Sequence, residues 1–341
     1  MDGFVLVTMK HSPTITVVIV AYHGKRWLAE CVRTLLDGCQ MPIYLVLVDN
    51  DGENGIDALP LEDFQHTVLE TPCPMGFAEA NNFALNEIGL DSEYVCFLNQ
   101  DTRSEAGWIT ACLECFERHS KLGAVTPLLM TYDGEQSEPN ALACGRQSVE
   151  FCEAEAANDF GGRFFEVPEI PATAMIVRSD VLRQVGPFDP IFGSYYEDYD
   201  LCHRIREAGY SVGICTAGLV AHYCGSATTT ENSNRRRMRQ IIRNRAIYRC
   251  RTTGNHRLGT VGGQFFRTLP HHLCRGLFRT PSSQPVSTTL AAHWDMLCIL
   301  RRLMSAKNDR AAWNAYLDEI GWHKDRMQQT SPPEFENTLA Q

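Results

Sequence analysis

Apolar residues follow two patterns over the first 130 positions of the chain. Short runs rich in apolar and β-branched residues, such as ITVVIVA at 15–21, predict strands that are covered on both faces. Between them, apolar residues recur every three or four positions, as in KRWLAECVRTLLDG at 25–38, and predict amphipathic helices. We predict strands at 15–21, 43–50, 66–70, 93–99 and 122–130, and helices at 25–38, 77–89 and 104–121. This alternation is typical of an α/β fold in which helices flank a parallel sheet.

The pattern is less regular after residue 130. Residues 131–165 are rich in Gly, Glu, Asn and Ala with little periodicity, so we predict loops or a short hairpin there. Beyond them we predict strands at 172–179, 211–216 and 218–223, helices at 179–186, 197–209 and 231–251, and an aromatic loop at 187–196. The remaining residues are predicted to be helical, with breaks at Pro, Ser and Thr. We therefore divide the chain into an α/β domain at 1–230 and a helical extension at 231–341.

Composition narrows the classes of function. The net charge of -10, from 31 basic and 41 acidic residues, argues against a general nucleic-acid binder, because such proteins need a broad positive potential. No apolar stretch reaches the roughly 18 residues needed to cross a bilayer. The 14 cysteines are scattered, and the N-terminal MDGFVLVTMKHSP lacks the pattern of a secretory signal, so we expect a reduced, cytoplasmic setting.

One cysteine pair, Cys112 and Cys115, has CxxC spacing, but it lies inside a predicted helix and has no second pair at zinc-site distance. We interpret both thiols as packing residues. The first strand ends in AYHG rather than in the GxGxxG of dinucleotide-binding proteins, which disfavours an oxidoreductase.

Candidate ligand-binding residues follow the predicted strands. Tyr22 follows the first strand and Asp49 ends the second, and the carboxyl ends of neighbouring parallel strands meet at one edge of a sheet. An aromatic ring can stack on a pyrimidine while a carboxylate accepts its imide hydrogen. The alternative is that Asp49 caps the turn in VDNDGENG and that Tyr22 is an ordinary rim residue.

Two further strand ends carry candidate metal ligands. Asp101 in LNQDT could hold a divalent cation, because Mg²⁺ uses one or two carboxylates and completes its shell with water and substrate phosphates. It could equally cap the following helix. His222 in GLVAHY is either a metal ligand or an ordinary partly buried histidine.

A cluster of acids begins the helix predicted in SYYEDYDLCHRIREAGY. Glu197, Asp198 and Asp200 lie in its first turn, where the helix dipole favours negative charge, and Asp200 is spaced to pair with Arg204. That structural explanation does not account for adjacent acids after a loop with glycine and two tyrosines. One of these carboxylates could instead serve as a general base toward a hydroxyl.

Taken in order, these stretches resemble a known family. The segments VVIVAYHG, LVDN, GFAEANN, LNQDT, VGPFD, YYEDYDLCHRIREAGY and AHYCGS, between residues 14 and 250, are similar to the family 2 glycosyltransferases of GT-A fold, in particular to their bacterial rhamnosyltransferase-like branch. The resemblance implies a mostly parallel, Rossmann-like sheet flanked by helices, followed by a C-terminal helical extension.

The resemblance also implies an activity. We expect inverting transfer of rhamnose or another hexose from a nucleotide diphosphate donor, dTDP- or UDP-linked, to a hydroxyl of a glycan or lipid-linked acceptor in cell-surface polysaccharide synthesis. Mg²⁺ or Mn²⁺ would assist. The alternative is a noncatalytic relative that only binds nucleotide sugars.

The site residues are carried over from the same resemblance. Asp198 is implied as the catalytic base, with Glu197 beside it, and Asp101 and His222 as metal ligands. The residues implied in donor binding are Tyr22, Asp49, Gly76, Asn81, Asn99 and Asp101. The chain departs from the family at Asn99, which replaces the first acid of a DxD motif, at Pro74, where relatives usually have asparagine, and at Ala172, where glycine is common.

The arginine-rich helix at 231–251 has two possible roles. Its eight arginines could form a solvated face or pair with acids elsewhere in this acidic protein. They could instead approach the anionic lipids of the inner face of a cell membrane, where a lipid-linked acceptor would be presented. The sequence leaves both open.

Overall fold

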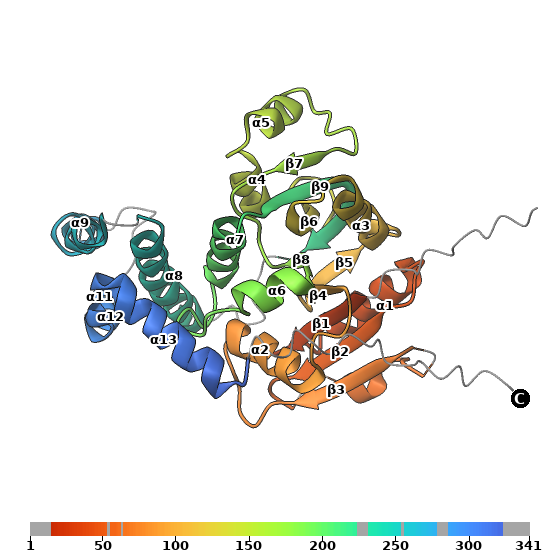
Figure 1. Ribbon diagram of the computed structural model, residues 1–341, viewed down its shortest axis with the longest axis horizontal. Helices are drawn as coiled ribbons and strands as arrows, with labels where there is room; N and C mark the ends of the chain where they lie inside the picture. The colour runs from red at the N-terminus through yellow and green to blue at the C-terminus, as the bar shows by residue number, and fades with distance from the viewer. Residues whose placement is uncertain are drawn as a thin grey trace, which may run out of the picture.

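The sheet is the frame on which the candidate residues are placed. The computed structural model describes residues 15–52, 55–62, 64–223, 231–253, 256–277 and 286–322. The strands in these ranges are β1 (Ile15–Ala21), β2 (Tyr44–Asp49), β3 (His66–Glu70), β4 (Tyr94–Leu98), β5 (Thr102–Ser104), β6 (Leu122–Thr131), β7 (Phe164–Glu166), β8 (Ala174–Arg178) and β9 (Ser211–His222). They form one sheet in the order β3-β2-β1-β4-β8-β6-β9-β5, with β7 paired to β9 (Figure 1).

The sheet is mixed but mostly parallel, as predicted. β1, β2, β3 and β4 pair in parallel, and so do β6 and β9. β8 runs antiparallel to both β4 and β6, and β5 and β7 run antiparallel to β9. Among the described strands, six therefore point one way and three the other.

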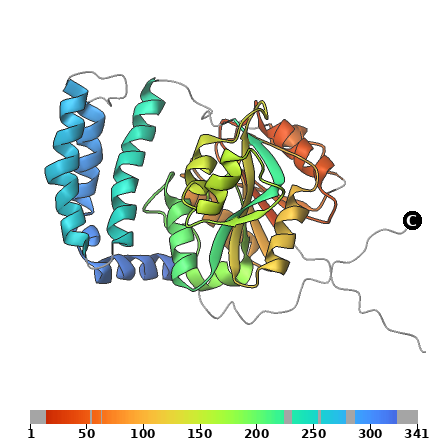
Figure 2. The same ribbon diagram turned by 90° about the horizontal axis from the view of Figure 1, so that it is seen from above.

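The helices of the α/β part cover both faces of this sheet, and the helices of the extension form a separate group. Those of the α/β part are α1 (Leu28–Gly38), α2 (Phe77–Ile88), α3 (Trp108–Arg118), α4 (Pro139–Gly145), α5 (Val149–Ala156), α6 (Ser179–Val185) and α7 (Glu197–Glu207). Those of the extension are α8 (Glu231–Thr252), α9 (Arg257–Gly263), the π-helical turn η3 (Gln264–Thr268), α10 (Leu269–Leu277), α11 (Val286–Cys298), α12 (Leu300–Met304) and α13 (Ala306–Glu319). Figure 2 shows the extension standing beside the sheet as a separate bundle, with α13 running back toward the α/β part.

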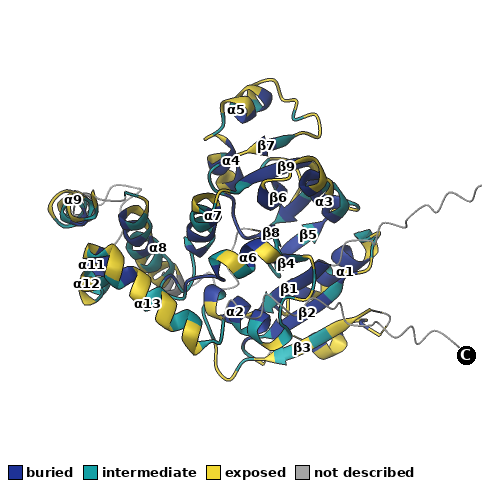
Figure 3. Ribbon diagram, viewed as in Figure 1, coloured by how far each residue is buried: buried dark blue, intermediate teal, exposed yellow. Residues whose placement is uncertain are grey.

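Alternation along each strand builds two cores. Val17 and Ile19 of β1 pack in the core that contains residues of α1 and α3, whereas Val18 packs in the core that contains residues of α2 and α7. Successive side chains of a strand point to opposite faces, so a nearly all-apolar strand needs helices on both sides. The central strands are accordingly buried over almost all of their length, namely β1, β2, β4, β6 and β8, whereas the edge strand β3 is not (Figure 3). Cys112 and Cys115 lie in the first core, where the packing interpretation placed them.

Three local predictions need correction. Residues 131–165 are not merely loops or a hairpin, because they contain α4, α5 and β7. These helices are too short to show an apolar period, and local caps begin them: Glu138 accepts a hydrogen bond from the Ala141 N–H (2.9 Å) and Ser148 from that of Phe151 (3.5 Å). The helix predicted at 104–121 begins only at Trp108, since residues 102–104 pair with β9.

The third correction concerns β9. The strands predicted separately at 211–216 and 218–223 form one strand, Ser211–His222. Its pairing with β6 jumps from Cys215 opposite Pro127 to Leu219 opposite Leu128. The residues between them bulge out of the ladder, which is why the sequence pattern is interrupted there.

The extension shares its core with the loop that precedes α7. Phe192 of that loop is fully buried among Ala246, Ile247 and Cys250 of α8 and Met296 of α11. The predicted boundary at residue 230 therefore does not separate two independent cores. Among the helices of the described ranges, none combines the length and the apolarity needed to span a bilayer.

Candidate functional site

The candidate ligands gather at the carboxyl edge of β1, β2 and β4. Ala21 is in register with Asp49, so Tyr22 and Asp49 leave the sheet side by side. The Asn99 N–H, just past β4, donates to the Thr173 carbonyl (2.8 Å), just before antiparallel β8. Because β8 runs antiparallel to β4, its amino end joins the same edge, and the segment before β8 takes part in the site.

A cavity of about 290 Å³ opens beside Asp49. It is lined by Asp49, Asn50, Asp51, Gly52, Glu70, Thr71, Pro72, Cys73 and Pro74. One carboxylate oxygen of Asp49 accepts a hydrogen bond from the Gly52 N–H (2.8 Å), so the capping role that the sequence left open is present. Capping uses one oxygen and does not remove the carboxylate from the cavity wall. Pro74, the departure noted in the sequence, lies in this wall.

Sequence reasoning missed two amides that shape this end of the site. Gln100 donates to the Tyr22 carbonyl (2.6 Å) and accepts from the Tyr22 N–H (3.0 Å), which holds the half-exposed tyrosine in place. Asn50 donates to the Met75 carbonyl (3.0 Å) and accepts from the Met75 N–H (2.9 Å), which ties β2 to the segment before α2. Both lie inside motifs quoted from the sequence, but only their partners show that they position the backbone.

Gly76 and Asn81, the candidates on α2, have structural roles. A Cβ at Gly76 would lie 3.0 Å from the Gly193 carbonyl oxygen, so glycine allows α2 to approach the loop before α7. The Ala78 N–H then donates to that carbonyl (2.8 Å). Asn81 is buried and donates to the Phe77 carbonyl of its own helix (2.9 Å). A direct donor contact by Asn81 remains a prediction.

Asp101 and His222 are brought together from distant parts of the chain. Pairing of β5 with β9 places Thr102 opposite His222, and Asp101 Oδ1 lies 3.3 Å from His222 Nε2. Asn99 Nδ2 is 3.4 Å from the same nitrogen. The Asp101 carboxylate suits Mg²⁺ or Mn²⁺, provided that donor phosphates and water complete the shell, and the His222 imidazole could add a nitrogen ligand. Asn99 turns its amide nitrogen toward that ring. In the described part of the chain no three His, Cys, Asp or Glu side chains cluster as a metal site, so the protein alone supplies few ligands.

The acidic helix α7 begins after a strained turn. Tyr195 and Tyr196 have φ angles of 72° and 74°, in the left-handed region that tyrosine rarely adopts. Such strain persists only where surrounding contacts impose it, and it gathers at functional sites. Here the contacts come from the extension, since the Asn244 side-chain amide lies within 2.8 Å of the carbonyl oxygens of Phe192, Ser194 and Tyr195.

Asn244 could not be recognised from the sequence. It stands among arginines in α8, and its partners lie about fifty residues earlier in the chain. A short sequence motif cannot indicate a contact between residues that are so far apart in the chain. Its effect is to hold the loop that leads directly into Glu197 and Asp198.

The three acids in the first turn of α7 have three different environments. Asp200 is buried between Arg204 (2.9 Å) and Arg251 (2.6 Å); burial opposes its charge, but the two arginines prevail and lower its pKa. The pair with Arg204 is the one predicted from i,i+4 spacing. Burial, and then the charge of Asp198, raise the pKa of buried Glu197 well above its usual range.

Asp198 has the properties of a general base. Burial raises its pKa to about 6, although N–H donors oppose the shift: Tyr199 (2.9 Å) and Ala172 (3.3 Å). The Ala172 contact lies one residue from Thr173, whose carbonyl binds Asn99. Backbone contacts therefore bring Asp198 to the edge that carries the candidate donor ligands. Its carboxylate is partly buried and ionised at neutral pH, as proton abstraction requires.

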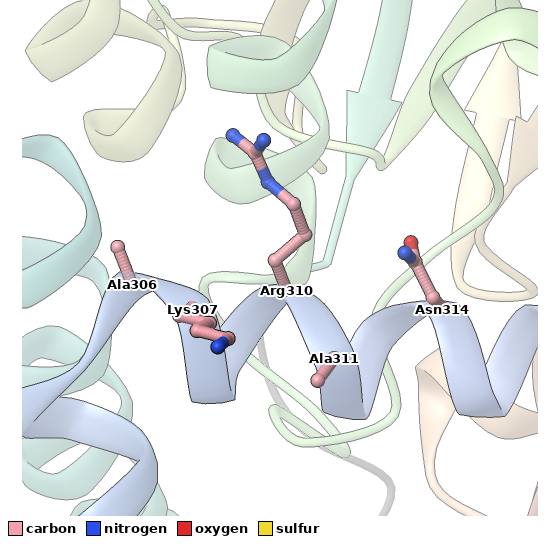
Figure 4. Close-up of a pocket in the computed structure, with 5 residues that line it drawn as sticks. All are labelled: Ala306, Lys307, Arg310, Ala311 and Asn314. Carbon is pink, nitrogen blue, oxygen red and sulfur yellow. The ribbon is translucent and has the colours of Figure 1, made fainter.

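A second hollow, of about 460 Å³, lies on α13. It is lined by Ala306, Lys307, Arg310, Ala311 and Asn314 (Figure 4). Its ionisable groups are two cations, without an acid or a nucleophile. We therefore place the candidate chemistry at the sheet edge rather than here.

Comparison with protein families and curated proteins gives concordant matches. A family model described as "Glycosyltransferase like family 2" matches residues 13–243. N-acetylglucosaminyl-diphospho-decaprenol L-rhamnosyltransferase of Mycobacterium tuberculosis is 24% identical over 232 residues, which cover 61% of this chain and 76% of that protein. Pre-mycofactocin glycosyltransferase of the same organism is 29% identical over 248 residues, covering 69% of this chain and 46% of the relative. The chain thus matches about half the length of the latter.

Solved structures show the same fold. The mannosyltransferase PcManGT of Pyrobaculum calidifontis, in complex with GDP-Man and Mn²⁺, has a TM-score of 0.52 at 14% identity, covering 93% of this chain and 83% of that one. GalNAc-T7 with UDP, GalNAc and Mn²⁺ has a TM-score of 0.50 at 12% identity, covering 69% and 48%. At such identities the likeness concerns the fold alone.

Proposed function

Because the chain belongs to glycosyltransferase family 2 and has the GT-A fold, we propose that it is an inverting hexosyltransferase that uses a nucleoside diphosphate sugar. Asp198 carries the proposal: an acid with a pKa of about 6, at the sheet edge where Tyr22, Asp49 and Asp101 leave their strands. Rhamnose is the first candidate sugar, because the matched relative in M. tuberculosis is a rhamnosyltransferase. The name of that relative also makes a lipid-linked diphosphate sugar the first acceptor to test.

In the proposed reaction, Asp198 takes the proton of an acceptor hydroxyl as that oxygen attacks the anomeric carbon. The bond from that carbon to the donor's diphosphate breaks on the opposite side, and the nucleoside diphosphate leaves with the electron pair. One displacement inverts the configuration. We assign the base to Asp198 rather than to Glu197, because burial raises the pKa of Glu197 well above its usual range, whereas the pKa of Asp198 is raised to about 6.

The donor end follows from the other residues at the edge. Tyr22 and Asp49 would hold the base beside the 290 Å³ cavity, with Gln100 fixing the tyrosine backbone. Asp101 and His222 would hold a divalent cation, which offsets the negative charge that the leaving diphosphate gains. Asn99 in place of an acid leaves one carboxylate there, so we expect the cation to bind together with the donor.

The pH dependence of transfer tests the assigned base. Since the carboxylate form of Asp198 is the active one and its pKa is about 6, kcat/KM should be constant above that pH. Below it the rate should fall about tenfold per pH unit. Initial rates between about pH 4.5 and 8, at saturating Mn²⁺, measure this limb. A profile that stays flat down to about pH 5 would contradict the assignment.

Thermal unfolding with nucleotide sugars tests the substrate class. A donor at about 100 times its Kd stabilises the folded state by about 2.7 kcal/mol, which corresponds to a Tm rise of about 5 °C. We expect thymidine and uridine diphosphate sugars to give this shift in the presence of Mn²⁺. Asp101→Asn should remove the Mn²⁺-dependent part of the shift, whereas Asp180→Asn, at an exposed carboxylate at the start of α6, should keep it. If no nucleoside diphosphate sugar raises the Tm, the proposal is wrong.

One observation favours a second candidate function. Asn99 replaces an acid beside Asp101, which suits a relative that binds nucleotide sugars without turnover. The ionised Asp198 argues for an enzyme. A donor that raises the Tm with Mn²⁺ but is neither transferred nor hydrolysed would identify the binding protein.

A further inference from the structure

Charge is divided sharply between the two parts of the chain. Residues 231–322 contain 16 basic and five acidic residues, a net charge of +11, whereas residues 1–230 contain 13 basic and 33 acidic residues, a net charge of -20. The overall charge of -10 conceals this division. A strong charge asymmetry of this kind indicates a surface for an anionic partner.

Part of the positive charge is used inside the protein. Arg251 pairs with buried acids, Arg239 pairs with Asp295 (2.5 Å), and Arg243 donates to the Ile191 carbonyl (2.6 Å). The pairing with acids considered for the arginine-rich helix is thus confirmed for Arg239 and Arg251. The other exposed basic side chains among the described residues of the extension include Arg236, Arg245, Arg249, Arg267, Arg301, Lys307 and Arg310. The exposed acids among its described side chains are Asp318 and Glu319.

The same extension exposes apolar side chains. Of the eleven large apolar residues that are exposed in the described ranges, six lie here: Leu258, Phe266, Leu290, Trp294, Leu297 and Met304. Phe266 on η3 is 84% exposed and Trp294 on α11 is 65% exposed. A water-soluble surface rarely gathers such residues without a partner.

Helix α11 has apolar side chains on two faces. His293, Ala292 and Met296 are buried on the side of the bundle. Leu290, Trp294 and Leu297, spaced four and three residues apart, form an exposed stripe on one face of the helix. The first face is explained by packing, and the second is not.

We propose that the extension docks on a membrane surface rich in anionic lipid, with the Leu290, Trp294 and Leu297 stripe in the interfacial layer and the exposed arginines among the headgroups. Tryptophan favours the membrane interface, and a helix binds there through buried apolar area together with attraction of its basic groups to anionic lipid. A second copy fits less well, because two positively charged extensions repel each other. Nucleic acid would bind the exposed arginines, but it would not bury the exposed Leu290 and Leu297 side chains.

Docking would bear directly on the catalytic edge. Asn244 of α8 holds the loop before Glu197 and Asp198, and Phe192 of that loop lies in the core of the extension. A bound extension would therefore hold the acids of α7 near the lipid surface, where a lipid-linked acceptor is found. The docking itself goes beyond the proposed function and needs neither donor nor turnover.

Vesicle flotation with the full chain tests this proposal. The protein should float with vesicles of equal parts phosphatidylcholine and phosphatidylglycerol at about 0.05 M NaCl, and stay below with phosphatidylcholine alone or at about 0.5 M NaCl. Trp294→Ser and the pair Arg245→Glu with Arg249→Glu should each lower the bound fraction about tenfold. Val149→Ser, at a 74% exposed position of α5, is the matched control and should float normally. Asp198→Asn should also float, which separates docking from transfer.

Several results would overturn the proposal. Flotation of Trp294→Ser at the wild-type level would show that the stripe does not enter the interface. Equal binding to neutral vesicles would remove the role of charge. Dimers whose formation depends on Trp294, or tight binding to RNA without flotation, would assign the surface to a second copy or to nucleic acid. A Tm equal to that of the wild-type protein is the control that each variant is folded.

Discussion

Asp198→Asn is expected to lower the turnover of sugar transfer by about two to four powers of ten while leaving the fold and donor binding intact. The amide is nearly the size of the carboxylate, and its oxygen can keep one of the two N–H hydrogen bonds, which Tyr199 donates to Oδ1 and Ala172 to Oδ2. What it loses is the ability to accept a proton from the acceptor hydroxyl. Single-turnover transfer with saturating donor measures the loss, and the Tm shift with donor checks binding.

Neighbouring acids supply the controls for this experiment. Asp200→Asn removes a buried ion-pair partner and should lower the free energy of unfolding. Substitution of the assigned base, Asp198, should not lower it. Asp180→Asn changes an exposed carboxylate at the start of α6 and should leave both stability and turnover near wild type. Full turnover by Asp198→Asn would remove the assigned base, whatever the other variants do.

Arg251→Met is expected to lower the free energy of unfolding by about 3–5 kcal/mol. The guanidinium lies 2.6 Å from Asp200, 2.5 Å from Asp189 and 2.9 Å from Asp309, and all three carboxylates are buried. Removing the cation leaves buried negative charge that Arg204 and Arg302 only partly balance. Because these acids come from α7, from the loop before it and from α13, turnover should fall as well.

Arg249→Met is the matched control for this prediction. Arg249 lies on the same helix but is exposed, so its loss should change stability by no more than about 0.5 kcal/mol. Urea unfolding followed by circular dichroism compares the variants with wild type. Equal midpoints for Arg251→Met and Arg249→Met would show that the buried network contributes no stability.

The same network gives the stability a pH dependence. Burial opposes the charge of Asp309, yet Arg251 and Arg302 lower its pKa to about 2, below its value in the unfolded chain. An acid with a lowered folded pKa stabilises the protein above the unfolded pKa, near 4, and this contribution is lost as the pH falls toward 2. Arg251→Met should therefore reduce the loss of stability between about pH 4 and pH 2.

Elements with long, regular patterns were predicted well. The apolar runs and periods correctly located strands β1, β2, β3 and β4 and helices α1 and α2. Burial of a strand on both faces, or of a helix along one stripe, requires a regular pattern of apolar residues that can be recognised in the sequence. The short elements after residue 131 show no such pattern of apolar residues. Seven or eight residues make at most two helical turns, so their existence depends on caps such as Glu138 and on neighbours that are distant in sequence.

The site divides in the same way. Tyr22 and Asp49 could be paired from sequence, because adjacent parallel strands must end at a common edge. The meeting of Asp101 with His222 depends on the antiparallel pairing of β5 with β9, and sequence reasoning reached it only through the family resemblance. The position of Asp198 beside Ala172 depends on β8 running against β4.

The sequence by itself determined the α/β class, the strand ends with candidate ligand-binding residues and the acidic start of α7. Each of these features depends on residues that are adjacent in the chain. Only the tertiary structure decided that the three acids differ: the pKa of Glu197 is raised well above its usual range, the pKa of Asp198 is raised to about 6, and Asp200 is held in ion pairs with Arg204 and Arg251. These differences depend on burial and on charges from Arg251 and from the segment before β8, and such contacts join residues that the chain order keeps far apart.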